Sequence, residues 1–179
     1  MRVSVFCSAS PYIPEIYFKE ARILAIELVK RNIDIVYGGG AIGLMGILAD
    51  TVIKHGGNIQ GIIAQFMYDL GWAHPGVTDL IIADNMSDRK TKYLVDIDAV
   101  IALPGGTGTL EEILDVISLK CLGLFSKPLI ILNSNGYYDP LNEMLEKGMI
   151  EKFIAYDQSV NWTFAESPLE IIQHLGIRI

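Results

Sequence analysis

Six short apolar runs alternate with longer amphipathic stretches along this chain of 179 residues. The runs are continuous rather than interleaved with polar residues, which is typical of strands covered on both faces, as in a parallel sheet. Strands that alternate with helices predict a doubly wound α/β fold: one mostly parallel, Rossmann-like sheet with helices on both faces, in a single domain over residues 1–179. The six runs are 3–7, 34–38, 59–64, 79–83, 98–104 and 127–133.

Helices are expected between these runs and after the last of them. Residues 15–31 carry apolar side chains at helical spacing. The segment 167–177 has the pattern of a closing helix, with Ser167 placed to cap its first turn.

Three glycine- or serine-containing segments follow predicted strands and therefore share one edge of the predicted sheet. Right-handed crossovers place the carboxyl ends of parallel strands along one edge, and ligands of such sheets bind in the crevice beyond it. The segments are CSASP (7–11), GGGAIGLMG (38–46) and PGGTGT (104–109). The sequence thus predicts a ligand site built from these turns.

The glycines of 38–46 end a strand and open a helix. Glycine lets backbone approach a ligand closely, and a helix N-terminus presents unpaired N–H groups to an anion such as a phosphate. A tight turn with close helix–sheet packing would explain the same glycines. The spacing is neither G-x-G-x-x-G nor a Walker motif, so it supports neither standard dinucleotide binding nor P-loop binding.

The turn 104–109 repeats this arrangement with added hydroxyl groups. Gly105, Gly106 and Gly108 can form a nest of backbone N–H groups, and Thr107 and Thr109 add side-chain donors at the start of a helix. A second anion site is therefore predicted here.

Charged residues near the same edge leave two interpretations open. Glu111 and Glu112 are adjacent and point about 100° apart on a helix, so only one can face the crevice squarely. Either carboxylate could instead only complement the helix dipole. Arg89 and Lys90, in the segment 85–94, could bind a phosphate or belong to a solvated helix face.

Charge and cysteine content narrow the possible partners and the compartment. The formal net charge of −7 leaves no uniform positive field for nucleic acid or an anionic membrane, so we expect neither as a partner. The two cysteines form no disulfide framework or C-x-x-C motif, which favours a reducing compartment. The first apolar run is too short for a signal-peptide core, and we therefore expect a cytoplasmic protein.

In combination the motifs carry a specific resemblance. PGGTGTLEE matches PGGxGTxxE, and with the preceding MSDRK and GGGAIGLMG the chain resembles the LONELY GUY family over roughly residues 2–150. This family comprises cytokinin-activating phosphoribohydrolases that are often labelled lysine decarboxylases. The resemblance implies a nucleotide-binding domain that cleaves the N-glycosidic bond of a nucleoside 5′-monophosphate to free base and ribose 5-phosphate.

The resemblance also implies roles for particular residues. Arg89 and Glu112 become the catalytic pair, with Lys90 and Glu111 in support. The family forms homodimers in which the helices bearing this pair contribute to the interface. Further substrate contacts implied by the resemblance are Ser8, Ser10, Gly39, Gly40, Met86, Pro104, Gly105, Gly106, Thr107, Gly108 and Thr109.

The expected chemistry agrees with these roles. Cleaving a ribosyl C–N bond develops oxocarbenium character, which a carboxylate such as Glu112 can stabilise while it positions and deprotonates water. Arg89 suits electrostatic support better than acid catalysis, because its proton stays bound. No redox step or activated phosphate is involved and no metal-ligand cluster stands out in the sequence, so we expect no cofactor.

Two questions stay open at this stage. Ala64 and Gly71–Trp72 depart from the family pattern near the expected base site, so the preference between isoprenylated adenine and other purines is not fixed. The alternative function is a non-hydrolytic nucleotide or molybdenum-cofactor carrier of similar fold. Lysine decarboxylation is weakly supported, because nothing marks Lys90 or Lys120 as the Schiff-base lysine that PLP chemistry needs.

Overall fold

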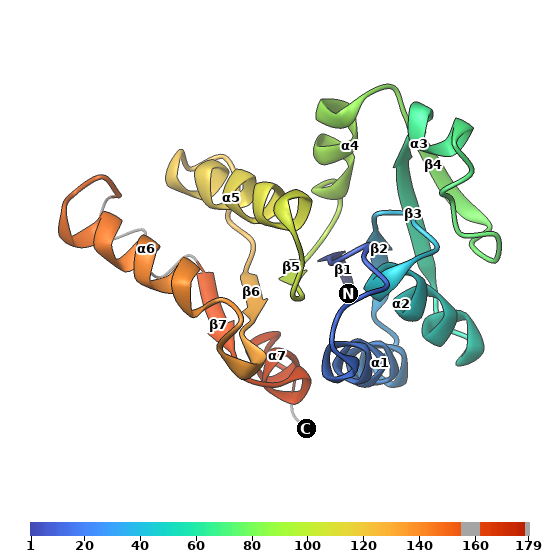
Figure 1. The fold of residues 1–179 in the computed structure, drawn as a ribbon, viewed down its shortest axis with the longest axis horizontal. Coiled ribbons are helices and arrows are strands. Elements are labelled where there is room, and N and C mark those ends of the chain that lie inside the picture. The colour runs from blue at the N-terminus through green and yellow to red at the C-terminus, as the bar shows by residue number, and fades with distance from the viewer. Residues whose placement is uncertain (155–161, 178–179) are drawn as a thin grey trace.

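The computed structural model describes residues 1–154 and 162–177 and contains one sheet of seven parallel strands (Figure 1). The strands lie in the order β4-β3-β2-β1-β5-β6-β7, so the chain winds outward from β1 in one direction and then returns to add β5 on the other side of it. The strands are β1 (Arg2–Phe6), β2 (Asp34–Tyr37), β3 (Ile59–Ala64), β4 (Asp79–Ala83), β5 (Ala99–Ala102), β6 (Leu129–Leu132) and β7 (Trp162–Ala165).

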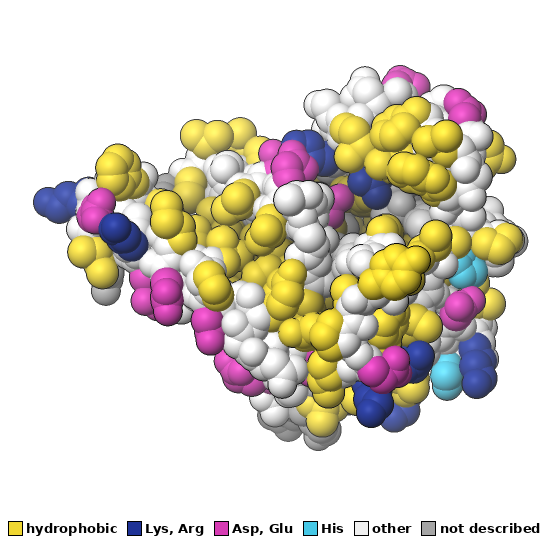
Figure 2. Space-filling model, viewed as in Figure 1, with side chains coloured by type: hydrophobic (Ala, Val, Ile, Leu, Met, Phe, Trp, Pro, Cys, Tyr) yellow, Lys and Arg dark blue, Asp and Glu magenta, His cyan; other side chains and the backbone are white. Residues whose placement is uncertain are grey.

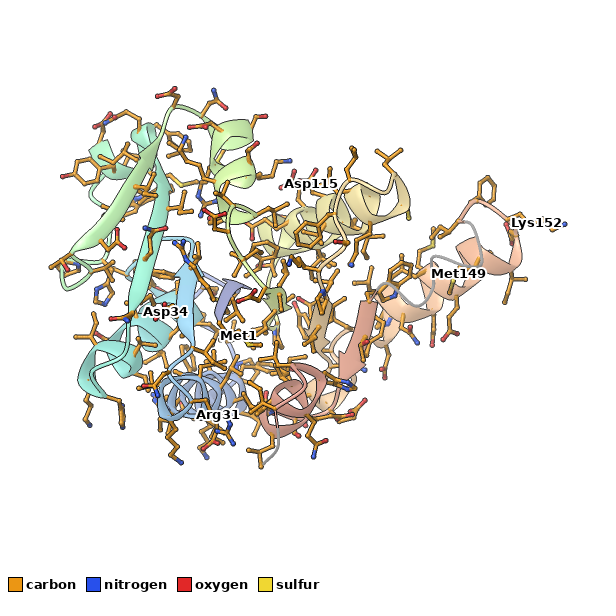
Figure 3. All side chains as sticks on the ribbon, turned by 180° about the vertical axis from the view of Figure 1, so that it is seen from behind. Met1, Arg31, Asp34, Asp115, Met149 and Lys152 are labelled. Atoms are coloured by element: carbon orange, nitrogen blue, oxygen red, sulfur yellow. The ribbon has the colours of Figure 1, made fainter. Side chains whose placement is uncertain are left out.

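The position between β1 and β5 is the topological switch point of this sheet. The connections that leave β1 and β5 run to opposite sides of the sheet, which opens a crevice beyond their carboxyl ends. At the opposite edge β1 and β2 begin together: the Asp34 N–H donates to the Met1 carbonyl at 3.0 Å (Figure 3). The predicted doubly wound α/β fold is thereby confirmed.

Helices cover both faces of the sheet, and each face has its own apolar core. Figure 1 shows α1, α2 and α7 on one side of the sheet and α4 and α5 on the other. Leu24, Leu28 and Leu48 belong to the first core, and Ile113 and Val116 to the second. The helices are α1 (Glu15–Lys30), α2 (Gly43–Lys54), α3 (Gln65–Asp69), α4 (Met86–Tyr93), α5 (Thr107–Cys121), α6 (Asp139–Ile150) and α7 (Pro168–His174).

The predicted elements correspond closely to the observed ones. All six predicted runs contain a strand, although the run 98–104 is a strand only as far as Ala102 and then turns into the crevice. The Ser167 side chain accepts a hydrogen bond from the Glu170 N–H at 3.3 Å, which confirms the predicted cap of α7. Strand β7 and the helix α6 were not predicted, and α3 lies between the third and fourth runs, where a helix was expected without stated bounds. Among the described residues, no helix has both the length and the apolar character needed to cross a membrane.

Candidate active site

A cavity of about 550 Å³ opens at the carboxyl ends of the central strands, next to the switch point. Its walls come from the turns after β1, β2 and β5 and from α2, α4 and α5. Figure 2 shows hydrophobic side chains gathered around this hollow, with acidic and basic side chains at its rim. A mostly apolar cavity with a few converging polar groups is the usual form of a small-molecule site.

Arg89 is buried in the cavity wall and held by backbone carbonyl groups. Strand β2 ends at Tyr37, opposite Gly61, and just beyond this pair the Arg89 guanidinium donates to two carbonyl oxygens. Its Nε donates to Ile62 O at 3.0 Å and its Nη2 to Gly38 O at 3.1 Å. A guanidinium has five donors in a fixed plane, so these bonds fix both its position and its orientation.

Two neighbours shape the space around this guanidinium. The Tyr93 ring lies beneath it, with the Arg89 Cζ 4.8 Å from the ring centroid, a distance at which the cation is attracted to the π-face. Gly38 leaves room for it, because a Cβ at Gly38 would lie 2.7 Å from Nη2. The first glycine of the predicted turn is therefore required by Arg89 itself.

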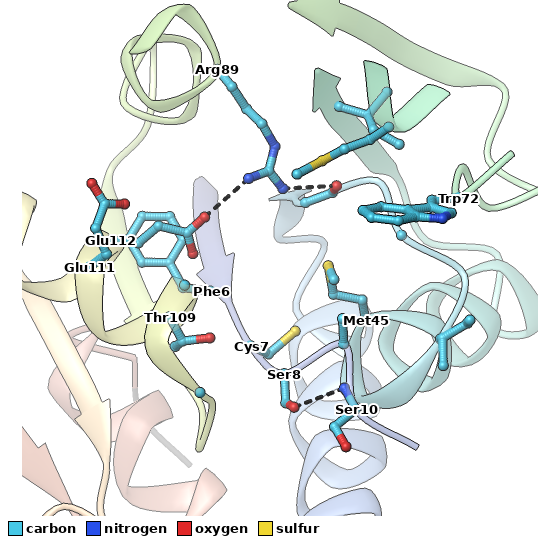
Figure 4. Close-up of a pocket in the computed structure, with 18 of the residues that line it drawn as sticks. Phe6, Cys7, Ser8, Ser10, Met45, Trp72, Arg89, Thr109, Glu111 and Glu112 are labelled. Atoms are coloured by element: carbon cyan, nitrogen blue, oxygen red, sulfur yellow. Dashed lines mark hydrogen bonds and ion pairs between the residues drawn. The ribbon is translucent and has the colours of Figure 1, made fainter. Parts of the chain in front are cut away.

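Glu112 extends from the first turns of α5 toward Arg89. Arg89 Nη1 donates to Glu112 Oε1 at 3.3 Å, and the Glu112 side chain is only 12% exposed (Figure 4). Burial raises the pKa of Glu112 to about 7; the positive charge of Arg89 opposes that rise and the negative charge of Glu111 adds to it. A carboxyl group with a pKa near neutrality can take up and return a proton at physiological pH.

Glu111 has a different environment from its neighbour. Its side chain is 53% exposed and accepts a hydrogen bond from Lys90 Nζ at 2.5 Å. Lys90 also lies 3.6 Å from Asp115, and its hydrogen bond to Glu111 raises the pKa of its ammonium group. Glu112 is therefore the carboxylate that faces Arg89, and Glu111 stands at the rim of the cavity beside Lys90.

The turn after β5 presents uncapped N–H groups to the cavity. Helix α5 begins at Thr107, and its N-cap, Gly106, has no side chain to accept from the first-turn donors. Gly106, Thr107, Gly108 and Thr109 line the cavity. Free donors together with the positive end of the helix dipole make this turn suitable for an anion.

Pro104 and Gly105 lie behind that turn, buried and outside the cavity lining. A Cβ on Gly105 would overlap the side chain of Thr109, so glycine is needed there for packing. Met86 does line the cavity, whereas Lys90 does not. The substrate contacts implied by the resemblance thus fall into two groups. Some, such as Met86, line the cavity, and others, such as Gly105, lie behind the residues that line it.

The loops after β1 and β2 meet on the other side of the cavity. Ser8 Oγ accepts from the Ser10 N–H at 3.0 Å, and both residues line the cavity. The Ser8 carbonyl accepts from the Leu44 N–H at 2.9 Å and so joins this loop to the start of α2. Gly40 lines the cavity, but Gly39 does not; Gly39 has a φ of +73°, a conformation that favours glycine.

The segment Trp72–His74, of which the sequence analysis placed only Trp72 near the expected base site, holds the loop after β2. The His74 N–H donates to Gly39 O at 2.9 Å, and the Ala41 N–H donates to Trp72 O at 3.1 Å. His74 is buried; its Nε2 lies 3.1 Å from Asp50 Oδ1, and its Nδ1 accepts from the Gly76 N–H. Because Nδ1 accepts, Nε2 carries the proton and donates to Asp50, which anchors the segment to α2.

Trp72 adds an aromatic wall to the cavity. Its ring stands edge-on to Phe66, with ring centroids 6.4 Å apart, and it is half exposed. Met45, Met67 and Met86 line the cavity with it. Of these, the sequence pointed only to Met86 as a contact and to Trp72 as a departure from the family pattern.

The described residues contain no group of three His, Cys, Asp or Glu side chains close enough together to hold a metal ion. The polar groups that converge on the cavity are instead the Arg89–Glu112 pair, two serines and the donors of the α5 turn.

This fold and cavity define a Rossmann-like α/β protein with a cavity of the form usual for small-molecule sites at the carboxyl ends of its strands. The family model described as possible lysine decarboxylase matches residues 45–175. A cytokinin riboside 5′-monophosphate phosphoribohydrolase of Arabidopsis thaliana is 40% identical over 174 residues, which cover 97% of this chain and 76% of the relative. A probable enzyme of the same name from Oryza sativa subsp. japonica is 40% identical over 97% of this chain and 71% of its own. The chain belongs to this family, named LONELY GUY.

Solved structures with the same fold are more distant in sequence. A molybdenum cofactor binding protein from Rippkaea orientalis has a TM-score of 0.73 at 20% identity and covers 98% of this chain and 94% of its own. A molybdenum cofactor carrier protein from Chlamydomonas reinhardtii has a TM-score of 0.73 at 16% identity and covers 98% of this chain and 96% of its own. At these identities the similarity shows the fold alone.

Proposed function

We propose that this protein hydrolyses the N-glycosidic bond of a purine nucleoside 5′-monophosphate, of cytokinin or AMP type, to free base and ribose 5-phosphate. The observation that carries the proposal is the buried Arg89–Glu112 pair, joined at 3.3 Å in the cavity wall. The curated relatives, which bear the name of this activity, support it.

Glu112 is the group that acts on the sugar and on water. As the C–N bond breaks, positive charge develops on the ribose, and a nearby carboxylate stabilises it. The base leaves with the bonding electrons and takes up a proton from solvent; water adds its oxygen to C1′ and gives a proton to Glu112, which returns it to solvent before the next turnover. The pKa of about 7 suits a carboxyl group that must accept and release a proton in each turnover.

Arg89 supplies a fixed positive charge beside that carboxylate. Its bonds to Ile62 O and Gly38 O hold the guanidinium in place before substrate arrives, so no reorganisation is needed during the reaction. An arginine keeps its proton, so its part is electrostatic: it orients Glu112 and stabilises the electron density that the departing base carries away.

The substrate's phosphate fits the start of α5, where Gly106 to Thr109 offer N–H and hydroxyl donors without a capping side chain. The base then lies against the wall formed by Trp72 and the cavity methionines. A flat purine stacks well on such a surface, and an apolar substituent on the purine would be accommodated there.

We also propose that the protein works as a homodimer in the cytoplasm, without a cofactor. Exposed apolar side chains on and just after α5, Leu114, Leu122 and Leu124, support a partner at this helix. A shallow depression lined by Leu110, Glu111 and Leu114 lies beside Thr107, which is shared with the cavity lining. A second copy seated there would stand close to the cavity rim.

The test is to incubate the purified protein with AMP and with isopentenyladenosine monophosphate, with and without EDTA, and to separate the products by chromatography. We expect wild type to release free base both with and without EDTA. The Glu112→Ala variant should release none, while circular dichroism shows that its fold is intact. A Glu112→Ala variant that keeps the wild-type rate would refute the mechanism. Tight nucleotide binding with unchanged ligand recovered after long incubation would favour the carrier function instead.

A further inference from the structure

Two adjacent tyrosines contact the turn after β5 from behind the cavity. Tyr137 Oη donates to Gly105 O at 2.7 Å, and Tyr138 Oη donates to Leu103 O at 2.9 Å. Neither tyrosine lines the cavity. Their hydroxyl groups can therefore affect a ligand only through the turn itself.

The bond from Tyr137 determines which way one peptide unit faces. The Gly105 carbonyl and the Gly106 N–H belong to the same planar peptide, so they point in opposite directions. Tyr137 holds the carbonyl on the side away from the cavity. The Gly106 N–H is thereby directed to the other side, where Gly106 forms part of the cavity lining.

The Gly106 carbonyl is held by the Leu110 N–H at 3.0 Å, whereas the Gly105 carbonyl, one peptide earlier, is held by Tyr137. Gly105 and Gly106 flank this earlier peptide on both sides, and glycine has the widest choice of backbone conformations. Gly106 is the N-cap of α5 and has no side-chain cap of its own. A hydroxyl that donates to the carbonyl also polarises the peptide, which makes its N–H a better donor.

Tyr137 is itself held in place by other aromatic rings. It stands edge-on to Tyr17 of α1, with centroids 5.6 Å apart, and edge-on to Tyr138 at 4.9 Å. The hydroxyl is thus presented by a fixed ring rather than by a freely rotating side chain.

We propose that Tyr137 is a positioning residue for the substrate's phosphate: it orients the Gly105–Gly106 peptide so that the Gly106 N–H points at the phosphate. The proposal rests on the proposed function only in that the ligand carries a phosphate on its ribose. Because the backbone N–H makes the contact, Tyr137 acts without touching substrate.

Tyr137→Phe removes the hydroxyl and keeps the ring, which is 41% exposed, so the fold should survive. Tyr138→Phe is the matched control: its hydroxyl contacts the Leu103 carbonyl and the Gly105 backbone, neither residue lines the cavity, and the Leu103 carbonyl is joined to Pro104, which has no N–H. We expect Tyr138→Phe to lower the melting temperature without a selective effect on phosphate ligands.

The measurement is the Kd of ribose 5-phosphate and of adenosine, by calorimetry, for wild type and both variants. Tyr137→Phe should weaken ribose 5-phosphate about tenfold, the size of one lost charge-assisted hydrogen bond, and leave adenosine within about twofold. In turnover with AMP, KM should rise by a similar factor while kcat changes little.

Unchanged ribose 5-phosphate binding in Tyr137→Phe would overturn the assignment, as would equal losses in the two variants or no binding by wild type. Because this measurement needs no turnover, it separates the two proposals. Phosphate binding that depends on Tyr137, in a protein that releases no base, would refute the proposed function alone. Base release with Tyr137→Phe indistinguishable from wild type would refute the positioning role alone.

Discussion

Replacing Glu112 by glutamine should make the protein more stable at alkaline pH while it abolishes catalysis. Burial raises the pKa of Glu112 from its ordinary 4.5 to about 7, against the attraction of Arg89. At 1.36 kcal/mol per pKa unit, this difference corresponds to roughly 3 kcal/mol of lost folding free energy once the group is ionised in both states. Glutamine has nearly the same shape and never ionises, so it escapes that cost.

The direction in which the free energy of unfolding changes with pH depends on whether the folded or the unfolded chain holds the proton. Below pH 4.5 Glu112 is neutral in both folded and unfolded chains, and it imposes no penalty. Between pH 4.5 and about 7 the folded chain keeps a proton that the unfolded chain has released, so the free energy of unfolding falls as the pH rises. By about pH 8 the penalty is nearly complete. Of the roughly 3 kcal/mol, about 2 develops between pH 5.5 and 8.

Urea denaturation of wild type and Glu112→Gln at several pH values from 5.5 to 8.5 measures this directly. We expect the two curves of unfolding free energy to diverge by about 2 kcal/mol, a shift of about 1 M in urea midpoint. Glu111→Gln is the matched comparison and should change the curve much less, because its side chain is 53% exposed and its charge adds less to the pKa rise of Glu112 than burial does. A Glu112→Gln curve parallel to wild type would show that burial does not tune this carboxyl group.

Two further predictions concern turnover. Because the active form of Glu112 is the carboxylate, kcat/KM should rise with pH through about 7 and then level off; a profile that falls through this range would assign Glu112 to acid catalysis instead. Trp72→Ala removes the aromatic wall, so the KM for isopentenyladenosine monophosphate should rise about tenfold, with a kcat change below about threefold. Unchanged KM values for that nucleotide and for AMP would place the base elsewhere.

The strands were predictable because burial on both faces leaves a continuous apolar run, and the one strand that was missed lacks this signal. Strand β7 has four residues, of which Thr163 and Phe164 are partly exposed. Among the strands of the described residues it pairs only with β6, at the edge of the sheet. Its position in the sheet is determined by pairing with the backbone of β6, about thirty residues earlier in the chain. A local sequence pattern does not indicate such a long-range pairing.

The same limit explains why the position of the segment Trp72–His74 beside the cavity was not predicted. The turns after β1, β2 and β5 were found because parallel strands bring their carboxyl ends to a common edge. The segment Trp72–His74 reaches that edge by pairing with Gly39–Ala41 through backbone hydrogen bonds and an isolated bridge between Gly40 and Ala73. Backbone pairing of this kind leaves no side-chain pattern in either segment. The departure from the family pattern at Trp72 indicated the position of the expected base site. It did not indicate the backbone pairing that brings Trp72 to the cavity.

The choice between Glu111 and Glu112 was open at the level of spacing, yet the phase of α5 decides it. Ile113, Val116 and Ile117 are buried against the sheet and set the rotation of the helix. Glu112 precedes Val116 by four residues and so shares the buried side, whereas Glu111 precedes the partly exposed Asp115 by four and faces outward. The apolar positions that anchor α5 thus also carry a carboxylate into the protein. Burial by that packing raises its pKa toward neutrality, so the helix phase that stabilises the fold also produces the reactive group.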